Sequence, residues 1–312
     1  MSSRAMNQIQ ESNLSLNCPL WTALVTPFHA NGEIDFTSLE AIARDQADAG
    51  NGILLLGSTG EGLALSFEEQ LSIVEYICRL SLAVPLMVAV GGHDLPSQLK
   101  WLQTCNRLPV QAYLLGSPLY AKPGPQGQYL WFRALLDQAK YPCMLYNVPS
   151  RSGIDLDVET LAKLQHHDNC WALKEASGEL EQFLRYRQAC PELALYSGED
   201  AMMPYLASAG AQGLVSVCAN AWPEATRAYV ELSLTAQNQG LFPLWQNAIA
   251  PLFAVANPIP VKQLMFEQQV LSSPTLRPPL THTELSDSQA LVHQDQLISQ
   301  WQAQRQGQAC LN

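Results

Sequence analysis

Two short segments carry the residues best suited to chemistry, YNVPSRSG (146–153) and LKEASG (173–178). Each follows a short apolar run that predicts a buried strand, so Tyr146 and Lys174 are expected where strands end and loops begin. Burial disfavours an ammonium ion and leaves a lysine amine free to act as a nucleophile. A tyrosine on the neighbouring strand can carry protons to and from that amine. The pair predicts carbonyl chemistry through a Schiff base. The alternatives are a lysine paired with a carboxylate such as Glu175 and an ordinary core tyrosine whose hydroxyl bonds to the backbone.

A glycine-rich segment, GSTGEG (57–62), follows the second apolar run. Glycines let the backbone turn sharply and present N–H groups to a small anion, and Ser58 and Thr59 add hydroxyl donors. The segment lacks the GxxxxGK[ST] pattern of a nucleotide phosphate loop. A carboxylate is the ligand that it suits, although a plain turn between a strand and a helix is an equally good interpretation.

Arg151 follows Tyr146 in a loop bounded by proline and glycine. A guanidinium group binds a carboxylate through two parallel hydrogen bonds. Most loop arginines are simply solvated, but closeness to Tyr146 favours anion binding here. The six histidines show no metal-ligand spacing and no dinucleotide motif is present, so neither a metal nor a cofactor is expected.

Other candidate residues also fall at or near the ends of apolar runs. Tyr120 lies in SPLYAKPG (117–124) after the fourth run, and Gly198 lies in SGED (197–200) at the end of the seventh. Val215 belongs to GLVSV, the eighth run itself, where its backbone is expected to line a pocket. Gly198 and Val215 are therefore candidates for binding substrate.

Short apolar runs alternate with longer amphipathic stretches over most of the chain. Strand followed by helix, repeated eight times, indicates a parallel sheet. Near-continuous hydrophobicity is typical of strands buried on both faces. The predicted strands cover 22–28, 52–57, 85–92, 112–118, 142–149, 170–177, 193–198 and 213–217.

This pattern predicts an α/β fold, a (β/α)8 TIM barrel, with a doubly wound sheet as the alternative. The active site of such a barrel forms at the C-terminal ends of its strands, where the candidate residues fall. From about residue 220 the pattern is helical and broken by proline-rich turns. We expect a barrel over residues 1–218, with a polar lead over 1–20, and a helical C-terminal extension over 219–312, frayed at 304–312.

Composition limits the partners of this 312-residue chain. It is acidic, with a formal net charge of -11 and a pI near 4.9, and it has no run of Lys or Arg, so no nucleic acid partner is expected. Eight scattered cysteines without a CxxC pair are typical of a reducing compartment. The N-terminus lacks the apolar block of a signal peptide, and no apolar stretch is long enough to span a bilayer. A cytoplasmic protein without a membrane partner is expected.

Seven ordered motifs resemble those of the dihydrodipicolinate synthase/N-acetylneuraminate lyase family: GSTGEG, SPLYAKPG, YNVPSRSG, LKEASG, SGED, GLVSV and NPIPVK. The resemblance runs from about Thr22 to Leu280. It implies a (β/α)8 barrel with a helical C-terminal extension, a homotetramer formed as a dimer of dimers, and a Schiff base between Lys174 and pyruvate or another 2-oxo acid.

The arginine in YNVPSR is similar to the synthase branch of that family. This similarity implies condensation of pyruvate with L-aspartate-4-semialdehyde, on the lysine and diaminopimelate pathway, with Arg151 holding the carboxylate of the semialdehyde. It also implies a proton relay through Tyr146, Ser58 and Tyr120, with Tyr120 lent by the neighbouring subunit. The resemblance assigns the pyruvate carboxylate to Thr59 and a further pyruvate contact to Val215.

The chain departs from the synthase pattern at several positions. Ser58 stands where synthases usually have threonine, and Leu119 stands where they often have the first of two tyrosines. Serine at position 58 is common among the aldolases of the family, so a lyase acting on a 2-keto-3-deoxy sugar acid or N-acetylneuraminate is the alternative. A non-catalytic paralogue that binds a 2-oxo acid is a third. Other residues replace those that grip lysine in lysine-inhibited members, which predicts weak or absent lysine inhibition: Phe67, Gln70, Gln98 and Leu119.

Overall fold

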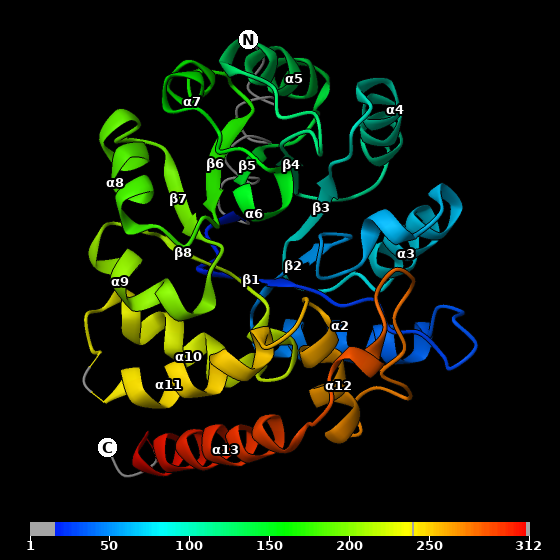
Figure 1. Cartoon of the computed structure of the whole chain (residues 1–312), viewed down its shortest axis with the longest axis vertical. Helices are drawn as coiled ribbons and strands as arrows, with labels where there is room; N and C mark the ends of the chain where they lie inside the picture. Colours follow the sequence, from blue (N-terminus) through cyan, green and yellow to red (C-terminus); the bar gives the residue numbers. More distant parts are fainter. Residues whose placement is uncertain (1–15, 239, 310–312) are drawn as a thin grey trace.

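The computed structural model describes residues 16–238 and 240–309. Its strands are parallel and form a closed barrel in the order β1 to β8, with β8 pairing back to β1 (Figure 1). This closure confirms the TIM barrel and excludes the doubly wound sheet. The strands are β1 Leu20–Ala23, β2 Gly52–Leu55, β3 Leu86–Val90, β4 Ala112–Gly116, β5 Cys143–Asn147, β6 Cys170–Glu175, β7 Ala194–Ser197 and β8 Gly213–Ser216.

Helices surround the barrel and connect its strands (Figure 1). Helix α3 shows why they form: Ser66 and Glu69 make a reciprocal capping box at its start, and Ile73 and Ile77 lie one turn apart on its buried face. The helices of the ring are α2 Phe36–Asp48, α3 Phe67–Arg79, α4 Leu95–Cys105, α5 Pro125–Gln138, α7 Val158–Leu164, α8 Leu180–Ala189, α9 Met203–Ser208 and α10 Pro223–Leu234. A single helical turn, α6 Pro149–Ser152, follows β5.

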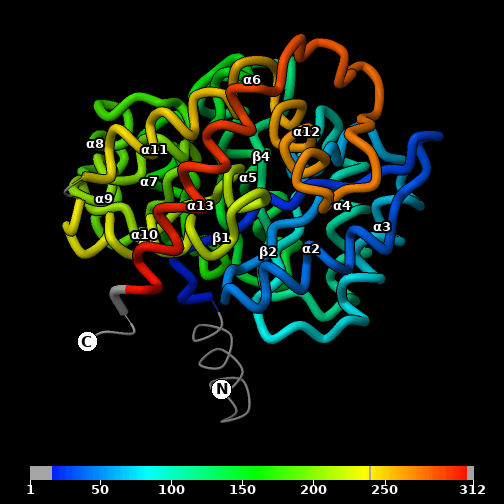
Figure 2. The backbone as a smooth tube through the Cα atoms, turned by 90° about the horizontal axis from the view of Figure 1, so that it is seen from below, coloured from blue at the N-terminus to red at the C-terminus, as the bar shows by residue number. Residues whose placement is uncertain are grey.

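Three further helices follow the ring: α11 Leu241–Ile249, α12 Ile259–Glu267 and α13 Gln289–Ala309. The long helix α13 packs along α10, α11 and α12 (Figure 2). The predicted division between barrel and extension at residue 218 stays a prediction. Residues 304–309 belong to helix α13, so the prediction that they are frayed is wrong, whereas residues 1–15 of the predicted polar lead and 310–312 lie outside the described residues. Among the helices described, none combines the length and apolar character needed to cross a membrane.

The first strand differs from its prediction. It covers Leu20–Ala23, whereas the apolar run predicted 22–28. Leu24, Val25 and Phe28 are buried but lie beyond the strand. An apolar run indicates that its residues are buried. Here the buried residues continue beyond the last residue that pairs with the neighbouring strands. The other seven strands lie within their predicted runs and end one or two residues earlier, so the last residues of each run begin the loops that form the site.

Two apolar layers hold the barrel together. One lies between the strands and the outer helices, and the other fills the barrel interior, where Trp21, Met144, Ala172 and Val215 pack together. Successive side chains of a strand face opposite sides, so each strand supplies both layers. The interior is a packed core, which leaves the C-terminal ends of the strands as the place for a site.

Candidate active site

Lys174 and Tyr146 lie side by side on neighbouring strands. β5 and β6 pair with Tyr146 opposite Lys174, and Nζ of Lys174 lies 4.4 Å from the centre of the Tyr146 ring. Lys174 is 6% exposed, and Tyr146 is half-buried. The structure therefore brings together the predicted nucleophile and the predicted proton carrier, and it shields the amine from water.

The carboxylate of Glu175 has partners other than Lys174. It accepts hydrogen bonds from Nδ2 of Asn147 at 2.6 Å and from the backbone N–H of Ser177 at 2.7 Å. Successive strand residues face opposite sides, so the two side chains point apart. Burial raises the pKa of Glu175, and the hydrogen bonds from Ser177 and Asn147 partly oppose this. The alternative in which Glu175 neutralises Lys174 is therefore wrong.

Because Gly198 has no side chain, Lys174 can occupy the space beside it. Its N–H donates to the carbonyl of Glu175 at 2.6 Å. A Cβ atom at this position would lie 2.8 Å from Cε of Lys174 and 2.5 Å from Cβ of Ala176. Both distances are well inside van der Waals contact. Position 198 therefore requires glycine for as long as Lys174 keeps its place.

The hydroxyl of Thr59 is held in a defined orientation. Thr59 is 3% exposed, and its Oγ1 accepts a hydrogen bond from Nδ2 of Asn257 at 3.0 Å. A threonine hydroxyl has one hydrogen of its own to donate. Because Asn257 acts as donor, that hydrogen stays available for an acceptor on a ligand. Ser58 is half-buried next to it, so two hydroxyl groups meet at this turn.

Arg151 reaches the same region from α6. Pro149 begins this single turn, and Gly153 ends it with a left-handed φ of 76°. The side chain is exposed, and within the part of the chain that the structure describes its guanidinium makes one hydrogen bond, at 3.5 Å, to the backbone carbonyl of Asn257. An arginine has five N–H donors, so most of them are available to a ligand. Asn257 thus contacts both Thr59 and Arg151.

A cavity of about 600 Å³ opens beside these residues. Ser58, Tyr146 and Arg151 line it, so a hydroxyl, a phenol and a guanidinium share one space. Such a space is large enough for small polar molecules. The lining also includes the positions predicted to have lost lysine recognition: Phe67, Gln70, Gln98 and Leu119.

The remaining predicted residues lie outside that lining. Thr59, Lys174 and Gly198 border the site as described above. Val215 is fully buried in the inner apolar layer, against which Tyr146 packs. Tyr120 is 94% exposed, with a left-handed φ of 67°, in the loop after β4. Its phenol therefore does not join the cavity of its own chain.

Two residues of the site were not predicted as functional. Burial, together with the nearby charge of Asp200, raises the pKa of Glu199 to about 7, although Lys174 partly opposes the rise. A carboxyl group with a pKa near neutrality close to an amine is suited to proton exchange. Its sequence signal is the acidic pair directly after β7, next to the lysine strand. Asn257 begins the NPIPVK segment, but that segment does not reveal its partners Thr59 and Arg151, which lie far away in sequence.

The chain matches the model of the dihydrodipicolinate synthetase family over residues 18–297. A relative from Francisella philomiragia, named 4-hydroxy-tetrahydrodipicolinate synthase, is 47% identical over 290 residues, which cover 93% of this chain and 98% of the relative. The structure of the synthase from Cyanidioschyzon merolae with lysine bound is 32% identical, with a TM-score of 0.84 and coverage of 90% and 98%. The chloride-inhibited synthase from Acinetobacter baumannii with pyruvate is 29% identical, with a TM-score of 0.84 and coverage of 90% and 99%.

Proposed function

The chain belongs to the dihydrodipicolinate synthetase family, and on this basis we propose that it is a 4-hydroxy-tetrahydrodipicolinate synthase, a lyase that condenses pyruvate with L-aspartate-4-semialdehyde. The observation that carries the proposal is the buried Lys174 amine, 4.4 Å from the centre of the Tyr146 ring, at the C-terminal end of β6. A shielded amine next to a phenol suits imine formation with a 2-oxo acid.

In the first half of the reaction, the Lys174 amine attacks C2 of pyruvate, and loss of water leaves an imine. The positively charged imine draws electrons from the methyl carbon, which loses a proton to form an enamine. Tyr146 lies next to the nitrogen and is the group placed to carry these protons. The free O–H of Thr59 and the hydroxyl of Ser58 suit the pyruvate carboxylate and the proton relay, respectively.

In the second half, the enamine carbon attacks the aldehyde carbon of the semialdehyde and forms the new C–C bond. The amino group of the semialdehyde then attacks the imine carbon, closes the ring and displaces the Lys174 amine. One water leaves for each product formed. Arg151 suits the carboxylate of the semialdehyde, because its guanidinium lines the cavity with most donors free. Fixing the second substrate in this way lowers the entropic cost of the encounter.

Tyr120 is assigned to the relay of a neighbouring subunit within a homotetramer. Its 94% exposure and its place outside its own cavity support this assignment. An exposed phenol is free to enter the site of a second copy, and a relay completed in this way makes activity depend on assembly. The measurement is kcat as a function of protein concentration, alongside the mass in solution. Full activity of a dilute monomer would contradict the role of Tyr120.

Borohydride reduction in the presence of pyruvate tests the proposed function. A stable adduct is expected on the peptide that contains Lys174, since hydride reduces the imine to an amine that cannot hydrolyse. Lys174→Ala should form no adduct and lose activity, while Lys163→Ala, which replaces an exposed lysine on α7, should behave as wild type. Full activity of the Lys174→Ala variant would refute the mechanism.

A sugar-acid aldolase of the same family is the second candidate, and Ser58 is the observation that favours it. Such an enzyme would use Lys174 and Tyr146 in the same way but would not need Arg151. Turnover of aspartate semialdehyde with pyruvate is therefore compared with cleavage of 2-keto-3-deoxy sugar acids and N-acetylneuraminate. Binding of pyruvate without turnover of any of these substrates would favour the third candidate, a non-catalytic 2-oxo acid binding protein.

A further inference from the structure

Glu61 belongs to the GSTGEG segment but takes no part in the cavity. It is 5% exposed, and its backbone is left-handed, with a φ of 53°. Its neighbours Ser58 and Gly62 line the cavity, whereas the Glu61 carboxylate lies at a buried junction with the residues around α12. Burying a charged group costs free energy, so a buried carboxylate next to this turn needs compensating partners.

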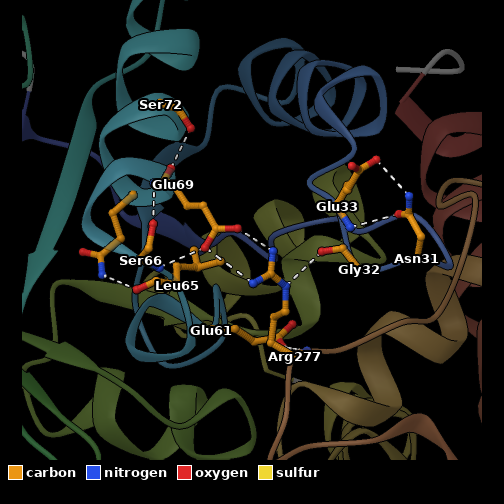
Figure 3. Close-up of polar contacts among 10 residues, drawn as sticks. Asn31, Gly32, Glu33, Glu61, Leu65, Ser66, Glu69, Ser72 and Arg277 are labelled. Atoms are coloured by element: carbon orange, nitrogen blue, oxygen red, sulfur yellow. Dashed lines mark hydrogen bonds and ion pairs between the residues drawn. The ribbon is translucent and has the colours of Figure 1, made fainter.

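The partners of Glu61 come from the C-terminal part of the chain. Nζ of Lys262, on α12, donates to Oε1 at 2.8 Å, and the backbone N–H of Arg277 donates to Oε2 at 2.8 Å. Lys262 is fully buried. Figure 3 shows the Arg277 guanidinium between the carboxylate of Glu69 and the carbonyl of Gly32, with Glu61 close to the Arg277 backbone. The Arg277 side chain is therefore held by contacts separate from the one that its backbone makes with Glu61.

Lys262 also closes a ring of contacts around the turn. Its Nζ donates a second hydrogen bond, at 2.9 Å, to the carbonyl of Thr26. Oγ1 of Thr26 donates at 2.6 Å to the carbonyl of Gly60, the residue between Thr59 and Glu61. One ammonium group thus holds the turn at two adjacent residues, directly at Glu61 and through Thr26 at Gly60.

Backbone contacts within and beside the turn restrict it further. The backbone N–H of Glu61 donates to the carbonyl of Ser58 at 3.2 Å. A Cβ atom on Gly60 would lie 2.9 Å from the carbonyl oxygen of Leu24, so the backbones are in close contact. Any movement of Glu61 is therefore transmitted to Ser58 and Thr59 through a tight, hydrogen-bonded backbone.

Electrostatics agree with a close pair. Burial lowers the pKa of Lys262 to about 8, and attraction by Glu61 opposes this change. Nζ of Lys262 also lies 4.3 Å from the centre of the Phe28 ring, which adds a favourable contact for the cation. Buried ion pairs contribute little net stability, so a gain in stability does not by itself account for this pair.

We propose that Glu61 and Lys262 are positioning residues, which hold the Ser58–Thr59 turn in the geometry that binds the carboxylate of the 2-oxo acid substrate. They touch no reacting atom and act through the turn. Through this pair, α12 controls the affinity for the 2-oxo acid at a turn that lies far from it in the sequence. The inference rests on the proposed function, because it assigns the pyruvate carboxylate to this turn.

The test measures pyruvate affinity apart from the second substrate. Borohydride trapping on Lys174 is followed against pyruvate concentration in wild type, Glu61→Gln, Lys262→Met and the double variant. Each single variant should raise the half-saturating pyruvate concentration at least about tenfold, the loss expected for one charge-assisted hydrogen bond. The double variant should not raise the half-saturating concentration beyond that of the more impaired single variant, since both changes break the same Glu61–Lys262 pair.

Glu69→Gln is the matched control. It removes a carboxylate from the same network (Figure 3), whose hydrogen bonds within the described residues go to Ser66 and the Arg277 side chain and not to the turn. Its half-saturating concentration should equal that of wild type. Thermal unfolding of every variant is measured in parallel. If a single variant fails to fold, the double variant, which leaves no buried charge unpaired, decides the question.

The outcomes separate the two proposals. An unchanged half-saturating concentration in Glu61→Gln, with lowered stability, would show a merely structural pair and overturn the positioning role alone. Absence of any adduct in wild type would refute the proposed function, and the positioning role with it. A tenfold rise in the variants, with normal trapping in the Glu69→Gln control, would support both.

Discussion

Gly198→Ala is expected to lower the reactivity of Lys174 by displacing its amine, although the lysine itself is unchanged. The new Cβ atom would lie 2.8 Å from Cε of Lys174, 2.5 Å from Cβ of Ala176 and 3.1 Å from the carbonyl oxygen of Glu175. Ala176 and the Glu175 carbonyl belong to or adjoin β6 and cannot move alone. The lysine side chain is the flexible neighbour and must move, and the 2.5 Å contact with Ala176 also requires a shift of the backbone. The amine is then displaced from its place beside Tyr146.

The magnitude follows from these contacts. Overpacking of a buried site typically costs about 1–3 kcal/mol of stability, so the variant should fold with a lowered melting temperature. A displacement of a reacting group by about 1 Å can cost on the order of 100-fold in rate, and kcat should fall by about that factor. The rate of borohydride trapping at saturating pyruvate should fall in parallel, since it reports imine formation at Lys174.

The assay combines steady-state turnover, adduct trapping and thermal unfolding. Gly307→Ala is the control, because a Cβ atom there would meet nothing within 4 Å, and alanine is the better residue inside helix α13. It should keep full activity and equal or higher stability. If Gly198→Ala traps pyruvate at the wild-type rate and keeps its kcat, Gly198 is not required for the position of the Lys174 amine.

Three more predictions follow from the site. Arg151→Ala should raise KM for the semialdehyde about 10- to 100-fold, the loss of a charge-assisted contact, and leave pyruvate trapping on Lys174 unchanged; an equal effect on both substrates would contradict its role. The native Glu199 carboxyl keeps a proton that the unfolded one releases, so its contribution to the free energy of unfolding should fall by about 3 kcal/mol as the pH rises from about 4.5 to about 7. In urea titrations the free energy of unfolding of wild type should fall by this amount relative to that of Glu199→Gln, and identical pH dependence in both proteins would refute the assignment. Sub-millimolar lysine should leave turnover unchanged, because the cavity lining presents the neutral amides of Gln70 and Gln98 and no carboxylate to its ammonium groups; inhibition in that range would sink this expectation.

Features encoded by neighbouring residues were predictable. Each apolar run marked a strand, and the residues at the run ends marked the loops, because burial of a strand needs only a local pattern. Tyr146 and Lys174 could be placed at one height by this reasoning, since parallel strands of a barrel share an end. The end of β1 was predicted too late for the complementary reason: Leu24, Val25 and Phe28 are apolar because they are buried, although they lie beyond the strand.

Contacts between distant residues were not predictable from the pattern. Asn257 lies 198 residues from Thr59 along the chain, and Lys262 lies 201 residues from Glu61. Both partners belong to NPIPVK (257–262), but nothing in that segment shows which distant residues its polar side chains contact. Glu199 gave a weak signal through its place after β7, but its raised pKa depends on burial, which the loop sequence does not reveal.

The sequence by itself determined the order of strands and helices and the kind of chemistry, since Lys174 at the end of an apolar run already indicates a nucleophilic amine. Only the tertiary structure decided which groups share the site. It turned Glu175 away from Lys174, placed Ser58, Tyr146 and Arg151 around one cavity, and tied the GSTGEG turn to α12 through Glu61 and Lys262. The physical reason is barrel closure, because it brings distant segments into contact and fixes which side chains are buried together.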